Sequence, residues 1–376
     1  MRALAFRTCI LAAGISLVLC AGDTSAGNPG DWSGKSAAAY LDGRMAWWID
    51  WPTAARDHQT FCVSCHTVVP YAMGRPALRA ALSEQAPSAN ERRLIGNVAK
   101  RVRMWAEVEP FYPDAQRGVP KTAESRGTES ILNAVILVGY DAGYAAGGTV
   151  PAARLSADTR LALSNMWALQ LAAGDDRGAW QWLQFHNAPW EGDSQYYGAA
   201  LAAIAVGTAP ENYRASPEIQ RNLEMLCEYL RREGPSQVLI NRVMLLWAST
   251  KIPGLLTAAE QKSIIDEALG KQQADGGFSL SSFVGAWKRA DGTPLETRSD
   301  GYATGIVSLV LEQAGVAREQ PALKRGLAWL AANQNQAEGR WLAYSLNKQR
   351  DLSSSVGRFM SDAATAYAVM ALKPAN

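Results

Sequence analysis

The residues with the clearest chemical signature are Cys62 and Cys65, which are separated by two residues and followed at once by His66. Two thiols about one helical turn apart can each add to a vinyl group of a porphyrin, and the adjacent imidazole can then bind the iron. A zinc site would need further ligands, and only His58 is near. A thioredoxin-like disulfide would need a βαβ context, whereas the surroundings have a helical pattern. The motif therefore predicts one covalent haem c, with Cys62 and Cys65 as attachment points and His66 as the proximal iron ligand.

The second iron ligand is left open by the sequence. Met104 suits a Met-ligated electron carrier, and we favour it. The alternatives are a vacant position, Met73, His58 or His186. An open iron permits oxygen or peroxide chemistry, whereas a filled one favours electron transfer.

The amino-terminal residues 1–26 have the pattern of a signal peptide. Two early arginines precede the apolar run 10–19, which is too short to span a bilayer comfortably, and small residues offer cleavage before Gly27. An uncleaved anchor is the rival interpretation, and a lipoprotein site at Cys20 is disfavoured because Leu19 stands where a small side chain is needed. The sequence predicts a periplasmic or otherwise exported protein without a transmembrane span in the mature chain.

The remaining cysteines and the overall charge exclude several classes of protein. Of five cysteines, Cys9 and Cys20 lie in the targeting segment, so no disulfide framework is expected. Cys227 lies in a helical pattern and is predicted to be a buried, inert thiol. The 37 basic and 35 acidic residues leave a formal net charge of +2, which gives no indication of a nucleic-acid partner. The 13 tryptophans are expected to pack in a core, with an aromatic-lined cavity as the alternative.

From about Ser130 onward the pattern predicts helices of two kinds in alternation. Nearly continuous apolar segments are typical of helices buried on most sides: 131–137, 197–206, 302–311 and 363–372. Amphipathic segments lie between them: 219–232, 258–273 and 322–333.

An internal repeat accompanies these helices, in which a helix end leads to a glutamine, a glycine turn and an aromatic residue. The three copies run from Gln170 to Trp180, from Gln272 to Phe278 and from Gln334 to Trp341. The pattern indicates helical hairpins repeated around a ring. We expect glycine to close each outer helix, the aromatic residue to pack over the turn, and the glutamine to bridge backbone groups of neighbouring hairpins.

The last copy carries a family resemblance. Arg325-Gly326-x-x-Trp329-Leu330-x-x-x-Gln334, continuing to Gly339-x-Trp341, is similar to the QW repeat of squalene-hopene cyclases, over roughly residues 130–372. The resemblance implies the α/α toroid of terpenoid cyclases and protein prenyltransferases. The whole chain also resembles bacterial exported proteins that couple a c-type haem segment to such a toroid, through Thr60–Thr67, Ser125–Glu129 and Asp300–Gly305.

The chemistries known for such rings are not expected here. No Asp-x-Asp-Asp acid sequence is present, and Asp175-Asp176 lies in a repeat turn, so terpene cyclisation is not predicted. A zinc site like that of the prenyltransferases needs Asp, Cys and His ligands, and this chain has too few histidines and cysteines to supply them. A thioester would need Cys-Gly-Glu-Gln, which Cys227-Glu228-Tyr229 does not match. The fold is therefore predicted without its familiar reactions.

Several polar and aromatic residues have modest interpretations. Arg126 and Glu129 are expected to form an i,i+3 pair, with binding of a haem propionate as the alternative. Asp193 and Asp300 precede buried helices and are read first as N-caps, with acid or substrate roles second. Three tryptophans before the motif are expected to pack on the porphyrin or the ring: Trp47, Trp48 and Trp51.

Together these observations predict a mostly α-helical protein with two parts that pack as one unit. Residues 27–123 would form a small cytochrome-c-like segment and residues 124–376 an α/α toroid. The leading function is periplasmic electron transfer through one haem to a redox partner protein. The alternatives are a haem-dependent oxidoreductase acting on an apolar, isoprenoid-like molecule in the toroid, and a non-redox binding or scaffold protein with a structural haem. Whether the protein is an enzyme is left open.

Overall fold

The computed structural model describes residues 32–144, 153–192 and 194–372. In these ranges the secondary structure is dominated by α-helices, with one short antiparallel pair formed by β1 (Ala55–Arg56) and β2 (Thr60–Phe61). The helices are α1 (Gly34–Asp50), α2 (Val68–Ala81), α3 (Ala89–Arg103), α4 (Asp114–Arg117), α5 (Lys121–Gly139), α6 (Ala157–Ala168), α7 (Tyr196–Thr208), α8 (Gln220–Glu233), α9 (Leu239–Lys251), α10 (Ala258–Leu269), α11 (Gly301–Gln313), α12 (Pro321–Ala332) and α13 (Phe359–Leu372).

The helices form two concentric layers. The inner layer is a closed ring in which α2, α5, α7, α9, α11 and α13 each pack on the next, and α13 returns to α2. The outer layer consists of α1, α3, α6, α8, α10 and α12, each packed on one or two inner helices. Inner helices such as α7 and α11 are apolar on nearly every side, whereas outer helices such as α8 bury one stripe only. The mostly helical toroid predicted from the sequence is therefore confirmed.

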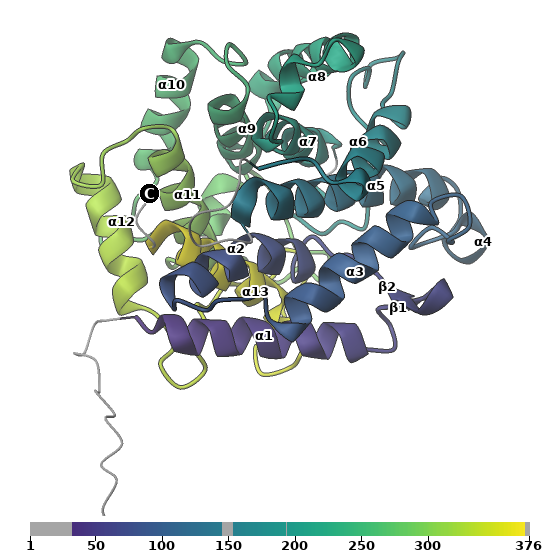
Figure 1. Cartoon of the computed structure of the whole chain (residues 1–376). Helices are drawn as coiled ribbons and strands as arrows, with labels where there is room; N and C mark the ends of the chain where they lie inside the picture. The colour runs from purple at the N-terminus through teal and green to yellow at the C-terminus, as the bar shows by residue number, and fades with distance from the viewer. Residues whose placement is uncertain (1–31, 145–152, 193, 373–376) are drawn as a thin grey trace, which may run out of the picture.

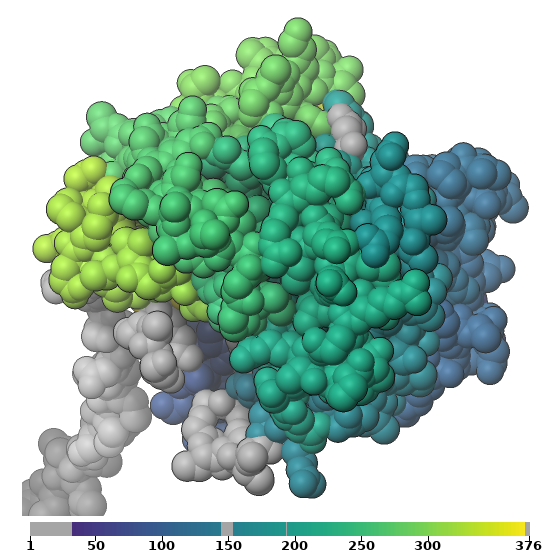
Figure 2. Space-filling model, turned by 90° about the horizontal axis from the view of Figure 1, so that it is seen from above, coloured from purple at the N-terminus to yellow at the C-terminus, as the bar shows by residue number. Residues whose placement is uncertain are grey.

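The ring closes where the two ends of the described chain meet. Figure 1 shows α1 and α2 lying beside α13, although they come from opposite ends of the sequence. The backbones of α2 and α13 approach closely, since a Cβ atom on Gly74 would lie only 2.9 Å from Cα of Ala366. The face seen in Figure 2 is formed mostly by the teal and green central segments of the chain.

The structure gives no evidence of a separate cytochrome-c-like segment. Helices α1, α2 and α3, which lie within the predicted segment 27–123, instead complete the two layers of the toroid. The predicted boundary near Ala123 falls inside helix α5. The reason is that α2 is apolar enough to be buried on most sides. It buries more apolar surface as a member of the inner ring than it would in a small separate unit.

The repeat turns behave as the sequence predicts. The glycines Gly178, Gly276 and Gly339 have φ angles of 99°, 90° and 75°, a region that favours glycine. The side-chain amide of each glutamine donates two hydrogen bonds. One goes to a backbone carbonyl of its own turn, and the other goes to a carbonyl at the start or the N-cap of the next outer helix. The pairs are Gln170 with the carbonyls of Gly178 and Asn222, Gln272 with those of Gly276 and Ala322, and Gln334 with those of Gly339 and Ser33. Gln334 thus joins α12 to the N-cap of α1, which links the last hairpin to the first helix.

Among the residues described, no helix combines the length and apolar character needed to cross a membrane. The predicted signal peptide lies outside the described residues.

Candidate functional site

The segment from Cys62 to His66 connects β2 to α2 at the inner ring. The Oγ atom of Ser64 accepts hydrogen bonds from the backbone N–H groups of Thr67 and Val68, at 3.3 and 3.2 Å, and so caps the start of α2. The indole N–H of Trp48 on α1 donates to the carbonyl of Cys62 at 2.7 Å. These contacts hold the motif in one conformation between α1 and α2.

The two motif thiols are free, and Cys62 is buried whereas Cys65 is half-buried. Burial raises the pKa of Cys62 to about 11 and that of Cys65 well above its usual value. Both thiols are therefore protonated at neutral pH, whereas reactive redox thiols need a lowered pKa. Cys227 is buried on α8 as a free thiol, as the sequence predicts, and burial raises its pKa as well.

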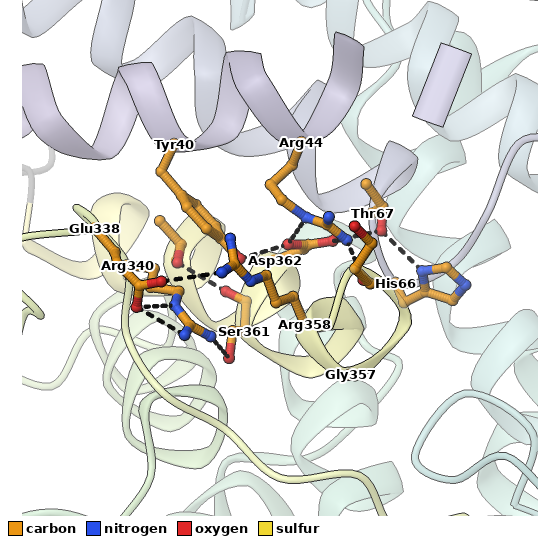
Figure 3. A network of polar contacts seen from close by, with 12 residues as sticks. Tyr40, Arg44, His66, Thr67, Glu338, Arg340, Gly357, Arg358, Ser361 and Asp362 are labelled. Atoms are coloured by element: carbon orange, nitrogen blue, oxygen red, sulfur yellow. Dashed lines mark hydrogen bonds and ion pairs between the residues drawn. The ribbon is translucent and has the colours of Figure 1, made fainter. Parts of the chain in front are cut away.

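The imidazole of His66 is oriented by a chain of hydrogen bonds, shown in Figure 3. Its Nδ1 lies 2.9 Å from Oγ1 of Thr67, and that hydroxyl donates to Oδ2 of Asp362 at 2.7 Å. Because the hydroxyl proton is directed to Asp362, the hydroxyl oxygen must accept from Nδ1, which therefore carries the ring proton. Nε2 keeps its lone pair and makes no hydrogen bond with any described residue.

Asp362 is itself fixed by two side chains of α1. Arg44 donates to both carboxylate oxygens, from Nε to Oδ1 at 2.7 Å and from Nη2 to Oδ2 at 2.9 Å, and Tyr40 donates to Oδ1 at 2.7 Å. Burial raises the pKa of Asp362, and the Arg44 guanidinium opposes that rise. Figure 3 shows this carboxylate between α1 and the His66 loop, so three distant segments position one imidazole.

Aromatic rings enclose the imidazole. His66 stacks on Phe359 with ring centroids 3.8 Å apart, and it meets the edges of Trp48 and Trp190 at 5.1 and 5.7 Å. Trp47 and Trp51 stack on each other and also contact Phe359. Burial lowers the pKa of His66 to about 3, helped by Arg44 and Arg350. The ring is therefore neutral at physiological pH.

A cavity of about 190 Å³ adjoins this histidine, and we call it the His66 pocket. Its apolar wall includes Phe185, Trp190, Phe359 and Met360, and its polar groups come from His66, Asn187, Ser345, Asn347 and Arg350. Arg350 is half-buried and close enough to His66 to lower its pKa, yet it makes no hydrogen bond or ion pair with a described residue. An unpaired guanidinium beside a neutral imidazole favours an anionic group.

The His66 pocket does not bring together the residues that the sequence predicts to bind haem. Neither Cys62 nor Cys65 lines the His66 pocket, and its volume is below the roughly 300–1,000 Å³ typical of pockets for drug-sized ligands. None of the candidate second ligands lines the pocket either: Met104 ends α3, Met73 is buried in α2, His58 is exposed and His186 stacks on Trp287. Among the residues described, no cluster of three or more His, Cys, Asp or Glu could hold a metal ion.

The other sequence-predicted residues have structural roles or lie outside the described ranges. Glu129 does not pair with Arg126 as expected. It forms a fully buried ion pair with Arg101, N to O 2.5 Å, while Arg126 lies over the ring of Trp105. Asp300 is an N-cap, as predicted, and accepts from the N–H of Ala303 at 2.9 Å. Asp193 lies outside the described residues.

Several site residues escaped the sequence reasoning. Arg350, Asn187 and Asn347 lie in loops without a motif, so no local pattern marks them. Asp362 did leave a signal, since it is a carboxylate directly before the apolar segment 363–372, whereas Glu191 is followed by a polar stretch and is not marked in this way. Glu191 is buried, accepts from the N–H of Phe185 at 2.9 Å, and has its pKa raised to about 8 by burial.

Comparison with known proteins identifies the fold. No family model matches the chain, and no curated protein matches it. Similar solved structures include a UGL variant with dGlcA-Glc-Rha-Glc, at 12% identity and TM-score 0.51, covering 90% of this chain and 96% of the other. Another is the unsaturated glucuronyl hydrolase of Bacillus sp. GL1, responsible for the degradation of glycosaminoglycan, at 12% identity and TM-score 0.50, covering 90% and 94%.

The chain is an α/α toroid. At 12% identity the likeness carries the fold and no more.

These neighbours correct the predicted family and function. They are glycosidases, not c-type haem proteins or squalene-hopene cyclases, so the predicted resemblance was wrong. Electron transfer, the haem-dependent oxidoreductase and the haem-containing scaffold find no support among them, and neither does a redox partner. The haem c attachment, the ligand roles of His66 and Met104, and the exported location are not tested by the comparisons and stay predictions.

Proposed function

We propose that this protein binds an acidic saccharide, with one carboxylate-bearing sugar unit in the His66 pocket. The observation that carries the proposal is the unpaired guanidinium of Arg350 among aromatic and amide side chains. Arg can hold a carboxylate through two parallel hydrogen bonds, which are about twice as strong as neutral ones. A carboxylate entering the pocket supplies the partner that Arg350 lacks.

The other lining groups match the rest of a sugar. Nε2 of His66 is an acceptor for a sugar hydroxyl, because its neighbour Nδ1 carries the proton. Asn347 donates its amide N–H to the carbonyl of His186 at 2.6 Å, which leaves its Oδ1 free to accept. Trp190 and Phe359 in the pocket lining offer apolar surface to the C–H groups of the ring. A few polar groups placed in an apolar wall are typical of small-molecule pockets.

The structural neighbours support a saccharide over other acidic ligands. One is responsible for the degradation of glycosaminoglycan, and another has the saccharide dGlcA-Glc-Rha-Glc. Most glycoside hydrolases need a pair of Asp or Glu side chains at the scissile bond. Among the described residues that line the His66 pocket, none is a carboxylate. We therefore propose binding as the primary activity.

Hydrolysis is a second candidate, and Glu191 favours it. Its raised pKa of about 8 keeps a proton available at neutral pH, as a general acid requires. Its neighbour Trp190 and its hydrogen-bond partner Phe185 both line the His66 pocket. If hydrolysis occurs, Glu191→Gln will abolish release of reducing sugar while the affinity stays within about twofold of wild type. Turnover retained by Glu191→Gln removes this candidate.

Calorimetric titration tests the binding proposal. We expect a disaccharide ending in glucuronic acid to bind, the matching glucose-ended disaccharide to bind about tenfold more weakly, and Arg350→Gln to lose that difference. Arg221→Gln is the matched control, since Arg221 is an exposed arginine of α8 outside the pocket. Equal affinity for the acidic and neutral sugars, or an Arg350→Gln variant that binds like wild type, contradicts the proposal.

A further inference from the structure

A second cavity adjoins the wall of the His66 pocket, and we call it the Arg117 pocket. It measures about 420 Å³ and lies between the β1 region and the chain from Glu109 to Arg117. Tyr112 lines this cavity and Phe185 lines the His66 pocket, and their rings meet edge to face with centroids 4.9 Å apart. One pair of aromatic side chains therefore separates the two cavities.

Two arginines line the Arg117 pocket, and neither has a carboxylate partner among the residues that the structure describes. Arg117 is exposed, lies over the ring of Tyr112 at 5.7 Å, and makes no hydrogen bond or ion pair with a described residue. Arg56 also lies over Tyr112, at 5.4 Å, and donates only to the backbone carbonyls of Thr53 and Ala55. Its Nε is buried without a hydrogen-bond partner. Both guanidinium groups are therefore available to an anion.

Two acidic residues also line this cavity and reduce its positive charge. Asp57 accepts from the N–H of Glu109 at 2.7 Å and lies 3.5 Å from Arg101, a guanidinium that it shares with Glu129, so its charge is partly matched. The carboxylate of Glu109 is exposed to solvent, where its interaction with the arginines is weak. Phe111 is a buried residue of the pocket lining, and the guanidinium of Arg101 lies 4.6 Å from its ring centroid.

We infer that the Arg117 pocket is a second subsite, which binds a further acidic unit of the same saccharide chain when its end occupies the His66 pocket. The inference rests on the proposed function and extends it from one sugar to a polyanionic oligosaccharide. Aromatic rings, arginines and the amide of Gln116 in one open cavity repeat the chemistry of the His66 pocket. Joining two weak sites through one ligand raises affinity by making the second contact intramolecular.

Length-dependent binding tests the inference. Fluorescently labelled oligosaccharides of alternating uronic acid and hexosamine, two, four and six sugars long, are titrated into wild type, Arg117→Gln, Arg350→Gln and the control Arg221→Gln. We expect wild type to bind the six-sugar ligand at least about tenfold more tightly than the two-sugar ligand. Arg117→Gln should lose about tenfold for the six-sugar ligand only, whereas Arg350→Gln should weaken binding at every length.

The outcomes separate the two proposals. Affinity that does not change with length, or an Arg117→Gln variant equal to wild type at every length, overturns the second subsite and leaves the His66 pocket intact. Binding of the six-sugar ligand that depends on Arg117 and not on Arg350 overturns the proposed function, and it also overturns the linked second subsite, because the Arg117 pocket would then bind the saccharide without the His66 pocket. No binding at any length overturns both.

Discussion

His66 reaches Asp362 through a single hydroxyl, that of Thr67, with distances of 2.9 and 2.7 Å along the path. The two outer residues come from opposite ends of the described chain, and 295 positions separate Thr67 from Asp362. A histidine held this way has one tautomer, one orientation and one free nitrogen. This chain of hydrogen bonds from His66 through Thr67 to Asp362, which we call the relay, therefore makes a half-buried, neutral imidazole a directed hydrogen-bond acceptor.

Removing the hydroxyl of Thr67 tests the relay. In Thr67→Val the Nδ1 proton loses its acceptor, so we expect both tautomers to appear and saccharide affinity to fall about three- to tenfold. The measurement is the ¹⁵N spectrum of the imidazole, which is tractable because the chain has only three histidines. Thr122→Val removes a hydroxyl at the start of α5 and serves as the control. A ring spectrum unchanged by Thr67→Val contradicts the relay.

Breaking the ion pair beneath the relay should destabilise the whole fold. The side chains of Arg44 and Asp362 are only 7% and 1% exposed, so Arg44→Met leaves a buried carboxylate without its cation. Loss of one partner of a buried pair typically costs about 3–5 kcal/mol of unfolding free energy. Urea denaturation followed by tryptophan fluorescence measures it. The exposed pair Lys262–Asp266 is the control, and Lys262→Met should change stability by less than about 0.5 kcal/mol. Equal effects of the two variants would show that the buried pair does not hold the fold.

Gly127 should tolerate no side chain, since a Cβ atom there would overlap the carbonyl oxygen of Gln181. Gly127→Ala would push α5 away from its neighbouring loop, at a cost of about 1–3 kcal/mol. Gly43→Ala on α1 is the matched change, because its Cβ meets no atom within 4 Å and alanine favours the helix by about 0.5–1 kcal/mol. Thermal unfolding should therefore move in opposite directions in the two variants, and a shift in the same direction refutes the packing argument.

Glu191 should make the protein less stable as pH rises. Its pKa is about 8 in the folded state and near 4.5 when unfolded, so between these values the folded state holds a proton that the unfolded state has lost. The stabilisation by the protonated carboxyl is complete below pH 4.5 and is lost as pH rises toward 8. At 1.36 kcal/mol per pKa unit it amounts to at most about 5 kcal/mol.

Glu191→Gln keeps a neutral group at this position and should remove that slope. Unfolding in urea at pH 5 and pH 9 provides the comparison. We expect the variant to resemble wild type at pH 5 and to exceed it in stability at pH 9. If the two proteins lose stability in parallel over this interval, Glu191 is already ionised in the folded state.

Mass spectrometry and solvent extraction of the purified protein test the predicted haem c directly. Covalent attachment at Cys62 and Cys65 would give an intact mass one haem above the polypeptide and a red colour that acidified organic solvent does not extract. Free thiols at both positions, with an unmodified mass, contradict the prediction. The result also bears on the His66 pocket, because a histidine bound to iron through Nε2 cannot accept a sugar hydroxyl through the same atom.

Sequence pattern sufficed wherever the decisive interactions are local. The apolar segment 363–372 lies within α13 and 302–311 within α11, since burial on all sides leaves a composition that can be read directly. The glutamine turns were predictable for a similar reason. Each side-chain amide donates to a backbone carbonyl four to eight positions later, within its own turn. Asp300 was recognisable as an N-cap because it directly precedes its helix.

Only the tertiary structure showed that the Cys62–His66 region is part of the toroid, and only the tertiary structure showed which side chains surround it. A five-residue motif predicts local chemistry, but the neighbours of His66 include Phe359, Asp362 and Arg350, which ring closure brings from the far end of the chain. No local sequence pattern shows that α2 completes the inner ring. The ring closes through the contact between α2 and α13, and that contact depends on the angle between successive helical hairpins all along the chain. Composition and spacing therefore determined the helices and their turns. The site, in contrast, is formed by packing between distant segments, and neither segment's sequence indicates that the other is its neighbour.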